Sequence, residues 1–460
     1  MYFKYLVCIL FFCFIYSVDN FSQNLSKEDV IEELNILQTT LQELHPGYTL
    51  FRSISDINFK FDSLRSVIER SDNHTLQQSM SYYSEICGLI RCGHTVVYAP
   101  GMLCENYIPI SVTERNNKLY ISSWLDSSIN VQQEYREILG IDSTPVSEIM
   151  SVLRNKISTD GNNEVSKLFN LQSEFHILYN KFYPCKPQYI LELGSGSGDI
   201  QNLIVKAINR KEIMKQMNGP KEEIETGMTE NGSYYIRLPT FYTKELKSNN
   251  INYRSYIKDF FREVKNKSGK EIIIDIRGNR GGSVHMAGYL ASFIIDSTFT
   301  FFNSVELNNT SRITFDKYII KDPFYRFRKI ITQKRGAKRY YTFHRELRAR
   351  KPNRFNPGKS VTVKVLIDPT TFSAATMFAA ILRAKSDAIF IGEETGGTCT
   401  GSGLSPIRLT LPYSNFIVEI PLAYIHLSVE GLQEYQLFRG VQPDSVVRSY
   451  PGFYFLQGPE

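Results

Sequence analysis

The stretch EIIIDIRGNRGGS, which runs from Glu271 to Ser283, decides the fold of this chain. Its first half is an apolar run typical of a fully buried β-strand, and its second half is a glycine-rich turn. A helical pattern, GSVHMAGYLASFI, overlaps its end. The stretch VLIDPTTFSAATMFAAILRAK, residues 365–385, repeats this order of buried strand, turn and helix. Strands that alternate with helices of this length predict an α/β core.

The second stretch places Ser373 at the start of its predicted helix, where a hydroxyl nucleophile would meet the positive end of the helix dipole. The N–H group of Ala374 would be available there to a tetrahedral oxyanion. The paired glycines Gly281 and Gly282 let backbone N–H groups approach a ligand closely, so they are further candidates for an oxyanion hole. A serine in this position is also a common helix N-cap. The combination of the two segments favours the nucleophile.

Four motifs occur along the chain in a fixed order: DIRGNRGG from Asp275, TFSAA from Thr371, IGEETGG from Ile391 and RGVQPD from Arg439. Together they resemble the C-terminal-processing (tail-specific) serine peptidases and their tricorn-core relatives. The resemblance implies a crotonase/ClpP-like α/β catalytic core with a helical N-terminal domain and a PDZ-like β-rich module. It further implies a peptidase that hydrolyses peptides or proteins without a cofactor or a metal.

The resemblance also indicates the general base. Tail-specific peptidases use a lysine shortly after the G-E-x-T motif, but Thr398 occupies that position here and no lysine lies nearby. The tricorn-like branch takes its base from a G-H-T element, which CGHTVVY matches, so His94 is the implied base. A histidine base suits a serine nucleophile because its pKa lies near neutral pH. His285, close to the glycine pair, is the alternative, and His74 fits less well.

A third residue should orient the base, and the tricorn-like branch uses a glutamate shortly before the terminal G-V-x-P-D element. Glu434 and Glu430 are the candidates. The chain departs from the family pattern at three positions. Leu437 stands where an acidic residue is expected, Thr376 where many relatives carry glutamate, and Cys92 where aspartate is more usual.

The N-terminus, MYFKYLVCILFFCFIYSVDNFSQN, has one lysine before a short apolar run, which is typical of a secretory signal peptide. The run is too short for a comfortable membrane span, so we expect export to the periplasm or the cell exterior and no permanent membrane anchor. The predicted organisation is a signal peptide at 1–23, a helical N-terminal domain at 24–94, a PDZ-like module at 95–207, a linker at 208–230 and a peptidase core at 231–460 with a basic insertion at 312–359.

The composition is that of a soluble globular protein, with 42% apolar and 22% charged residues. The net charge of +6 is unevenly placed, because residues 312–359 carry 16 lysines and arginines against three acidic residues. Such a segment is commonly a solvated surface. We expect it to overhang the cleft and to hold an acidic or C-terminal carboxylate of the substrate. Nucleic acid is an improbable partner for an exported protein.

Five cysteines follow the predicted signal peptide: Cys87, Cys92, Cys104, Cys185 and Cys399. No C-x-x-C pair or Cys/His cluster has zinc spacing, so no metal site is predicted. The first three lie close enough in sequence to supply one disulfide in an oxidising compartment.

The stretch YILELGSGSGDI, Tyr189–Ile200, offers a competing function, because methyltransferases that use S-adenosylmethionine begin their cofactor site in this way. Such a loop must join a strand to a helix and be followed by a second strand that ends in an acidic residue. Polar sequence, INRKEIMKQMNGPKEEIE, follows instead. We therefore interpret the stretch as a strand and a tight hairpin.

The sequence predicts an exported serine endopeptidase with a Ser–His–Glu arrangement and a backbone oxyanion hole. The alternative is a catalytically inactive protein on the same fold that binds a peptide or a hydrophobic ligand. The intact Ser373, His94 and glycine pair favour the enzyme, whereas Leu437 and Thr376 favour the binding protein.

Overall fold

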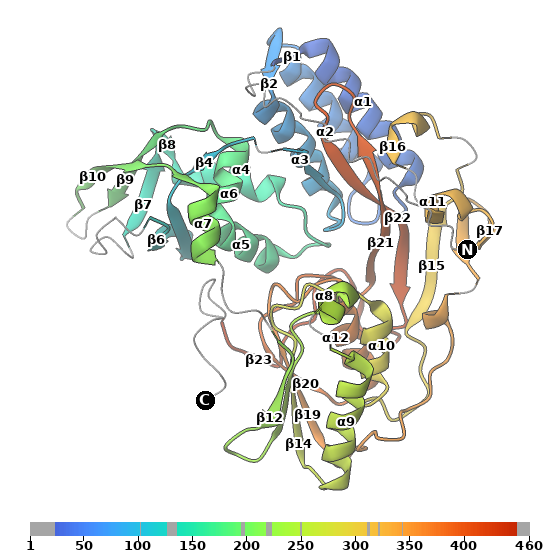
Figure 1. Ribbon diagram of the computed structural model, residues 1–460. Coiled ribbons are helices and arrows are strands. Elements are labelled where there is room, and N and C mark those ends of the chain that lie inside the picture. The colour runs from blue at the N-terminus through green and yellow to red at the C-terminus, as the bar shows by residue number, and fades with distance from the viewer. Residues whose placement is uncertain are drawn as a thin grey trace, which may run out of the picture.

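The computed structural model describes residues 24–101, 103–126, 136–194, 198–217, 223–248, 251–310, 313–320, 323–342 and 344–448. A bundle of N-terminal helices, a β-rich module and an α/β core with a second sheet are arranged around the middle of the molecule (Figure 1). None of the helices in these ranges has the length and apolar character needed to cross a membrane. The predicted signal peptide at 1–23 lies outside the described residues.

The N-terminal part is helical, as the sequence predicts. It consists of β1 (Asn24–Ser26), α1 (Lys27–Leu44), α2 (Ile54–Ile68), β2 (Asn73–Thr75) and α3 (Leu76–Ile90). Ser26 and Asp29 form a capping box that begins α1. Helix α3 ends at Arg91, whose φ of 56° turns the chain sharply into the segment that carries His94.

The β-rich module is an antiparallel sheet with its own apolar core. Its sheet has the order β10-β9-β7-β6-β5 and contains β5 (Ile110–Arg115), β6 (Lys118–Trp124), β7 (Glu137–Ile141), β8 (Thr144–Pro145), β9 (Gln188–Gly194) and β10 (Ile200–Lys206). Three helices pack with it: α4 (Val146–Lys156), α5 (Glu164–Ser173) and α6 (Phe175–Phe182). Because β9 and β10 pair antiparallel, with Gly194 opposite Ile200, the two strands form a hairpin and not the strand–helix unit of a nucleotide-binding fold.

A short connection leads to the α/β core through β11 (Ile208–Asn209), which pairs with β4 (Asn106–Tyr107), and α7 (Arg210–Met217). The central sheet has the order β12-β13-β14-β19-β20-β23: β12 (Glu225–Met228), β13 (Tyr234–Arg237), β14 (Glu271–Asp275), β19 (Thr362–Ile367), β20 (Ile389–Gly392) and β23 (Ser445–Val446). All neighbours after β12 are parallel. The core helices are α8 (Thr243–Ser248), α9 (Tyr253–Asn266), α10 (Val284–Ala291) and α12 (Ala374–Lys385). The predicted α/β fold class is confirmed.

A second sheet joins the core to the N-terminal helices. It contains β15 (Phe302–Asn308), β16 (Ile319–Ile320), β17 (Thr332–Arg335), β18 (Lys338–Tyr341), β21 (Gly401–Thr410) and β22 (Ile417–Leu427), in the order β16-β21-β22-β15-β18-β17. Strand β3 (Val96–Tyr98) pairs with β22, so the segment after His94 belongs to this sheet and not to the β-rich module. One continuous apolar core therefore runs from the N-terminal helices into the α/β core.

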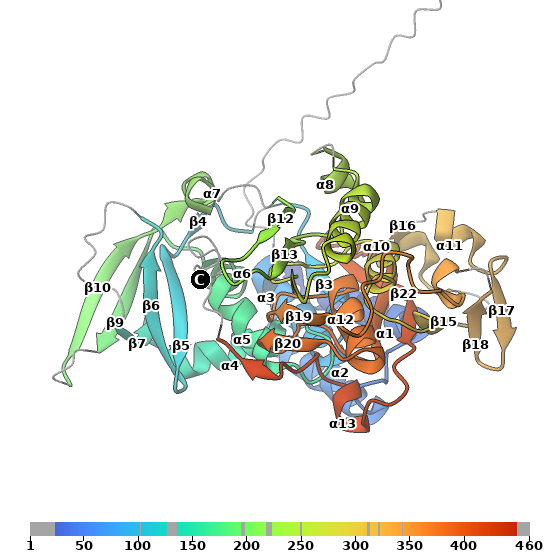
Figure 2. The same ribbon diagram turned by 90° about the horizontal axis from the view of Figure 1, so that it is seen from below.

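The basic segment 312–359 contributes to both edges of the second sheet, with β16 at one edge and the β17–β18 hairpin at the other. It contains η2 (Asp316–Tyr318), β16, α11 (Pro323–Phe327), the β17–β18 hairpin and η3 (Arg345–Leu347). The sheet order puts β22, β15 and β18 between β21 and β17, and the hairpin stands apart from α12 in both views (Figures 1 and 2). The hairpin therefore does not overhang the start of α12, contrary to the prediction. The segment returns to the core at η3, which packs on α10, and at Asn353, whose N–H donates to the carbonyl oxygen of Ser292.

The disulfide differs from the prediction as well. Cys104 pairs with Cys185, with their Cα atoms 5.8 Å apart, and so links the start of the β-rich module to the segment between α6 and β9. Cys87 and Cys92 are buried free thiols, as is Cys399.

Candidate active site

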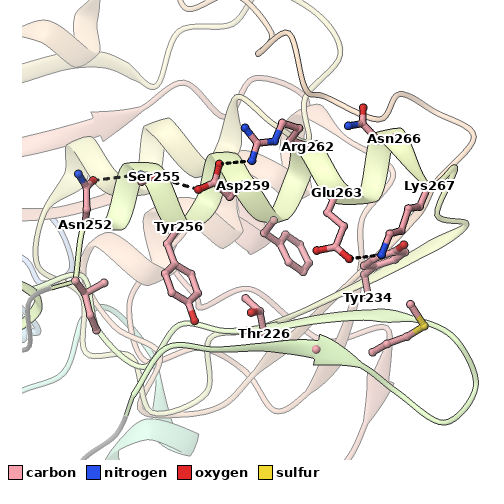
Figure 3. A pocket seen from close by; sticks show the side chains of 14 residues that line it. Thr226, Tyr234, Asn252, Ser255, Tyr256, Asp259, Arg262, Glu263, Asn266 and Lys267 are labelled. Atoms are coloured by element: carbon pink, nitrogen blue, oxygen red, sulfur yellow. Dashed lines mark hydrogen bonds and ion pairs between the residues drawn. The ribbon is translucent and has the colours of Figure 1, made fainter.

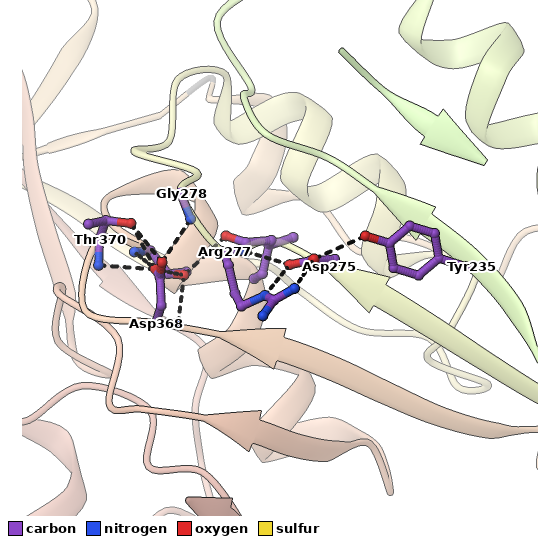
Figure 4. A network of polar contacts seen from close by, with 8 residues as sticks. Tyr235, Asp275, Arg277, Gly278, Asp368 and Thr370 are labelled. Carbon is purple, nitrogen blue, oxygen red and sulfur yellow. Dashed lines mark hydrogen bonds and ion pairs between the residues drawn. The ribbon is translucent and has the colours of Figure 1, made fainter. Parts of the chain in front are cut away.

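The turn before Ser373 is fixed by a buried carboxylate. Asp368 is fully buried, and its Oδ1 accepts hydrogen bonds from the N–H groups of Thr370 (3.0 Å) and Thr371 (2.8 Å). Its Oδ2 accepts the N–H of Gly278 at 3.0 Å, which ties this turn to the glycine-rich loop after β14 (Figure 4). The two segments that the sequence singled out therefore form one rigid unit.

The same loop is anchored at the end of β14. Asp275 is fully buried and accepts two hydrogen bonds from the guanidinium of Arg277, at 3.0 and 2.7 Å. Its Oδ2 also accepts the hydroxyl of Tyr235 at 3.1 Å (Figure 4). A buried carboxylate with a paired cation and further donors holds a single geometry, so the loop enters the site from a fixed point.

Ser373 has a strained backbone, with φ of 51° and ψ of −123°. A serine N-cap has extended φ and ψ, and its hydroxyl accepts a hydrogen bond from the first turn. Ser373 makes no such capping bond. A positive φ in a non-glycine residue is unfavourable and persists where the surroundings enforce it, commonly at functional sites. A strained strand–turn–helix elbow is also how α/β hydrolases expose a nucleophilic hydroxyl. These features exclude the simple N-cap interpretation.

Gly281 presses directly against the elbow. A Cβ atom at this position would lie 2.8 Å from Cβ of Ser373 and from the nitrogen of Ala374, and φ is +95°. The N–H of Gly281 donates to Oδ1 of Asn279 at 2.8 Å, so it is not available to an oxyanion. The N–H of Ala374, the first residue of α12, has no intrahelical partner. Gly282 packs against the backbone of Phe241.

His94 lies beside the elbow. Its Nε2 is 3.3 Å from Oγ of Ser373, and its ring stacks on that of Phe372 with centroids 4.9 Å apart. On the other side of the ring, Nδ1 lies 3.1 Å from Oγ of Ser402, which donates to Oδ2 of Asp160 at 3.1 Å. Burial lowers the pKa of His94, and the carboxylate of Asp160 opposes that shift. The arrangement resembles a serine nucleophile with an oriented base.

Comparison with known proteins agrees with this geometry. Residues 233–447 match the model of Peptidase family S41. This part of the chain belongs to that family. The chain is also similar in fold to mature CPAF, with a TM-score of 0.62 at 14% identity over 91% of this chain and 92% of that one. A CPAF structure complexed with lactacystin gives a TM-score of 0.62 at 13% identity, over 91% and 94% of the two chains. No curated protein matches the sequence. The predicted enzyme class, a serine-type peptidase, is confirmed.

The two glutamates predicted to orient His94 lie elsewhere. Glu430 forms an ion pair with Lys385 at 2.9 Å and accepts the hydroxyl of Ser428. Glu434 is the first residue of α13 (Glu434–Leu437) and is exposed. Nδ1 of His94 instead faces Ser402. Asp160, from the loop after α4, and Ser402, from β21, were missed because no local motif marks either of them.

The alternative histidines make other contacts. Nδ1 of His285 pairs with Glu346 of η3 at 2.8 Å. His74 is buried, and its Nε2 contacts the carbonyl oxygen of Ile68 at 2.9 Å. Neither has a contact with Ser373 among the interactions of the described residues.

Thr376, one of the departures from the family pattern, and Thr398 both have structural roles. Thr376 is buried, donates its hydroxyl to the carbonyl oxygen of Thr371 at 2.7 Å and accepts the N–H of Gly397 at 3.2 Å. Thr398, in the position of the absent lysine, donates to the carbonyl oxygen of Gly401 at 2.9 Å. Both threonines therefore fix the loop between β20 and β21. The side chain of Leu437 packs against the main core.

One group in the described part of the peptidase has the composition of a metal site. The ligand atoms of Cys92, His94 and Asp160 lie within 4.8 Å of one another. Sequence spacing did not reveal this group because Asp160 comes from a different segment than the other two residues.

A pocket of about 790 Å³ lies away from these residues, between β12 and α9 (Figure 3). Its charged lining residues pair with one another: Asp259 with Arg262 at 3.0 Å and Glu263 with Lys267 at 2.7 Å. None of the residues around Ser373 lines it. We therefore assign it no part in catalysis.

Proposed function

We propose that this S41 peptidase is an endopeptidase in which Ser373 attacks the substrate carbonyl and His94 removes the serine proton. The observation that carries the proposal is the 3.3 Å separation between Nε2 of His94 and Oγ of Ser373, at a strained elbow. A contact of this length shortens when a substrate closes the site. His94 would then return the proton to the leaving amine, and water would release the acyl group by the reverse of these steps.

In this proposal Ser402 and Asp160 orient the base. Nδ1–H of His94 donates to Oγ of Ser402, and the Ser402 hydroxyl donates to Asp160. This direction leaves the lone pair of Nε2 facing Ser373. When His94 becomes an imidazolium, the carboxylate of Asp160 stabilises the positive charge through one hydroxyl group. Burial lowers the pKa of His94, and the same interaction with the carboxylate of Asp160 opposes that lowering.

The oxyanion would be stabilised by the N–H of Ala374 together with that of Gly282. Ala374 stands at the positive end of α12, and a donor aimed at the developing charge stabilises the transition state selectively. Gly281 would contribute its small size and not its N–H group, which Asn279 occupies.

We also infer that the peptidase is exported and acts on peptides or proteins outside the cytoplasm. The inference rests on the signal-peptide pattern of residues 1–23. The β-rich module is antiparallel and has open sheet edges at β5 and β10, to which a substrate segment could add as a further strand. We propose that this module presents the substrate to Ser373.

Labelling with a fluorophosphonate probe tests the proposal. The chain without residues 1–23 should be labelled, and the variants Ser373→Ala and His94→Ala should not. Glu434→Gln is the matched control, since it changes an exposed acid at the position first expected to orient the base, and it should be labelled like the wild type. Labelling that survives Ser373→Ala would place the nucleophile elsewhere. No labelling of a folded wild type would favour the binding protein.

A further inference from the structure

Cys92, His94 and Asp160 combine three kinds of metal ligand at one point. A thiolate, an imidazole and a carboxylate together suit Zn²⁺, whereas Ca²⁺ and Mg²⁺ require oxygen ligands. Their ligand atoms lie within 4.8 Å of one another. Atoms bound to one tetrahedral zinc ion lie about 3–4 Å apart, so the group needs to contract by about 2 Å at most.

The backbone holds the three residues together. The N–H of Thr95 donates to the carbonyl oxygen of Cys92 at 2.9 Å, which closes a turn around Gly93 and His94. The N–H of Gly93 donates to Oδ1 of Asp160 at 2.6 Å. The carboxylate is therefore bound to the peptide unit between the other two ligands. Such support of a ligand by backbone hydrogen bonds is usual at metal sites.

The electrostatic environment favours a cation. Cys92 and Asp160 are both buried. No lysine or arginine forms an ion pair with Asp160 among the residues that the structure describes. A divalent cation would therefore compensate the buried carboxylate of Asp160, whose partners are otherwise the N–H of Gly93 and the hydroxyl of Ser402.

The other free cysteines provide an internal comparison. Cys87 and Cys399 are also buried thiols, yet neither belongs to a group of metal-ligating side chains in the described part of the chain. Cys92 is therefore the one free thiol in the described part of the chain that lies beside other metal-ligating side chains.

We propose that Cys92, Nδ1 of His94 and Asp160 form a zinc site, and that zinc binding there switches the peptidase off. A water molecule or the hydroxyl of Ser402 would complete the tetrahedron. The thiol proton leaves to solvent as the zinc–sulfur bond forms. The neutral imidazole has one lone pair, so when zinc takes it at Nδ1 the ring proton moves from Nδ1 to Nε2. His94 can then no longer accept the proton of Ser373.

The inhibitory half of this inference rests on the proposed role of His94 as the base, but the binding half does not. Binding is therefore measured in the Ser373→Ala variant, in which the nucleophile is absent and all three ligands remain. Titration calorimetry with Zn²⁺ should give one tight site. Titration with Co²⁺ should give a thiolate-to-cobalt charge-transfer band in the near ultraviolet.

The double variant Ser373→Ala/Cys92→Ser should lose the cobalt band and bind zinc about tenfold more weakly or worse, because loss of a ligand exceeds the usual effect of losing an outer-shell partner. Ser373→Ala/Cys87→Ser, which alters a buried thiol outside the group, should keep both properties. Absence of the band in Ser373→Ala, or equal zinc affinity in the two double variants, would overturn the site.

Inhibition is measured in the chain that retains Ser373. Zn²⁺ should abolish fluorophosphonate labelling and peptide hydrolysis, and a chelator should restore both. Cys92→Ser, compared with its own zinc-free rate, should need about tenfold more zinc for half-inhibition, whereas Cys87→Ser should respond like the wild type. Tight zinc binding without inhibition would overturn the proposed inhibition by zinc, but the zinc site itself would stand. If the wild type hydrolyses nothing, the proposed function fails, and the calorimetry and the cobalt spectrum still decide the site.

Discussion

His94 and Asp160 are joined by a single hydroxyl group, that of Ser402, whose Oγ lies 3.1 Å from a ring nitrogen of the histidine and 3.1 Å from an oxygen of the carboxylate. The three residues come from the turn after α3, the loop after α4 and strand β21. The base is therefore oriented where the N-terminal helices, the β-rich module and the second sheet meet. Its geometry depends on how all three parts pack.

Removal of the connecting hydroxyl should lower turnover more than binding. In Ser402→Ala, Nδ1 of His94 loses its partner and the ring is free to rotate, so we expect kcat to fall about 10- to 100-fold with little change in KM. Ser402→Thr retains a hydroxyl and should recover most of the rate. Steady-state kinetics on a peptide substrate measures both parameters. Equal losses in the alanine and threonine variants would indicate a packing defect and not a lost orienting contact.

Gly281 should be required for its small size. In Gly281→Ala, the new Cβ would meet Ser373 and the nitrogen of Ala374 at 2.8 Å, and a φ of +95° is unfavourable for alanine. We expect a loss of stability of about 1–3 kcal/mol and loss of fluorophosphonate labelling. Thermal unfolding and labelling are the measurements.

Gly431→Ala is the matched control, because Gly431 has a φ of +102° and no atom within 4 Å of a new Cβ. Gly431→Ala should lose about 1 kcal/mol of stability from backbone strain alone and should still be labelled. Loss of labelling in both variants would contradict a specific role for Gly281.

The acidic residues near the C-terminus should be dispensable for catalysis. The Glu430–Lys385 pair lies at the surface, where ion pairs contribute about 0–1 kcal/mol, and Glu434 is exposed. We expect Glu430→Gln and Glu434→Gln to keep kcat/KM within about twofold of the wild type. Asp160→Asn, measured beside them, should lose about 10-fold or more. A large loss in either glutamine variant with an active Asp160→Asn would restore the glutamate as the orienting residue.

The sequence was most informative where chemistry and local structure coincide. Buried strands followed by glycine or serine turns predict the parallel sheet, because a short run of residues determines both the strand and the loop at its end. The segment EVSKLFNLQSEFHILYNKF, residues 164–182, carries apolar residues at helical spacing and forms α5 and α6. These two helices were not predicted, because the turn patterns around the segment favoured strands.

Residues that act through long-range contacts could not be found in this way. Asp160 lies in STDGNN and Ser402 in TGSG, which are ordinary turn sequences until the fold brings them to His94. The pairing of Cys104 with Cys185 likewise depends on how α6 packs, since sequence separation does not limit a disulfide. The family resemblance predicted a glutamate as the residue that orients His94. The contacts of Asp160 and Ser402 depend on the fold of this particular chain, so the family pattern did not indicate them.

Glu33 should make stability depend on pH in an unusual direction. The residue is fully buried in α1, and its carboxylate accepts the N–H groups of Tyr413 and Ser414 at 2.7 Å and the hydroxyl of Tyr83 at 2.8 Å. It thereby fastens α1 to the β21–β22 turn. Burial raises the pKa of Glu33, and these hydrogen bonds only partly oppose the shift.

Because the pKa of Glu33 is higher in the folded state, the folded protein binds this proton more readily than the unfolded chain does. The contribution of Glu33 to stability is therefore fully present below its unfolded pKa and declines as the pH rises through the folded pKa. Glu33→Gln cannot titrate, and its amide presents a donor to one of the three groups. We expect it to destabilise the protein by about 1–2 kcal/mol at pH 7 and by more as the pH falls toward the unfolded pKa. Denaturant unfolding of both proteins across this range measures the difference, and a difference that shrinks with acidity would contradict the raised pKa.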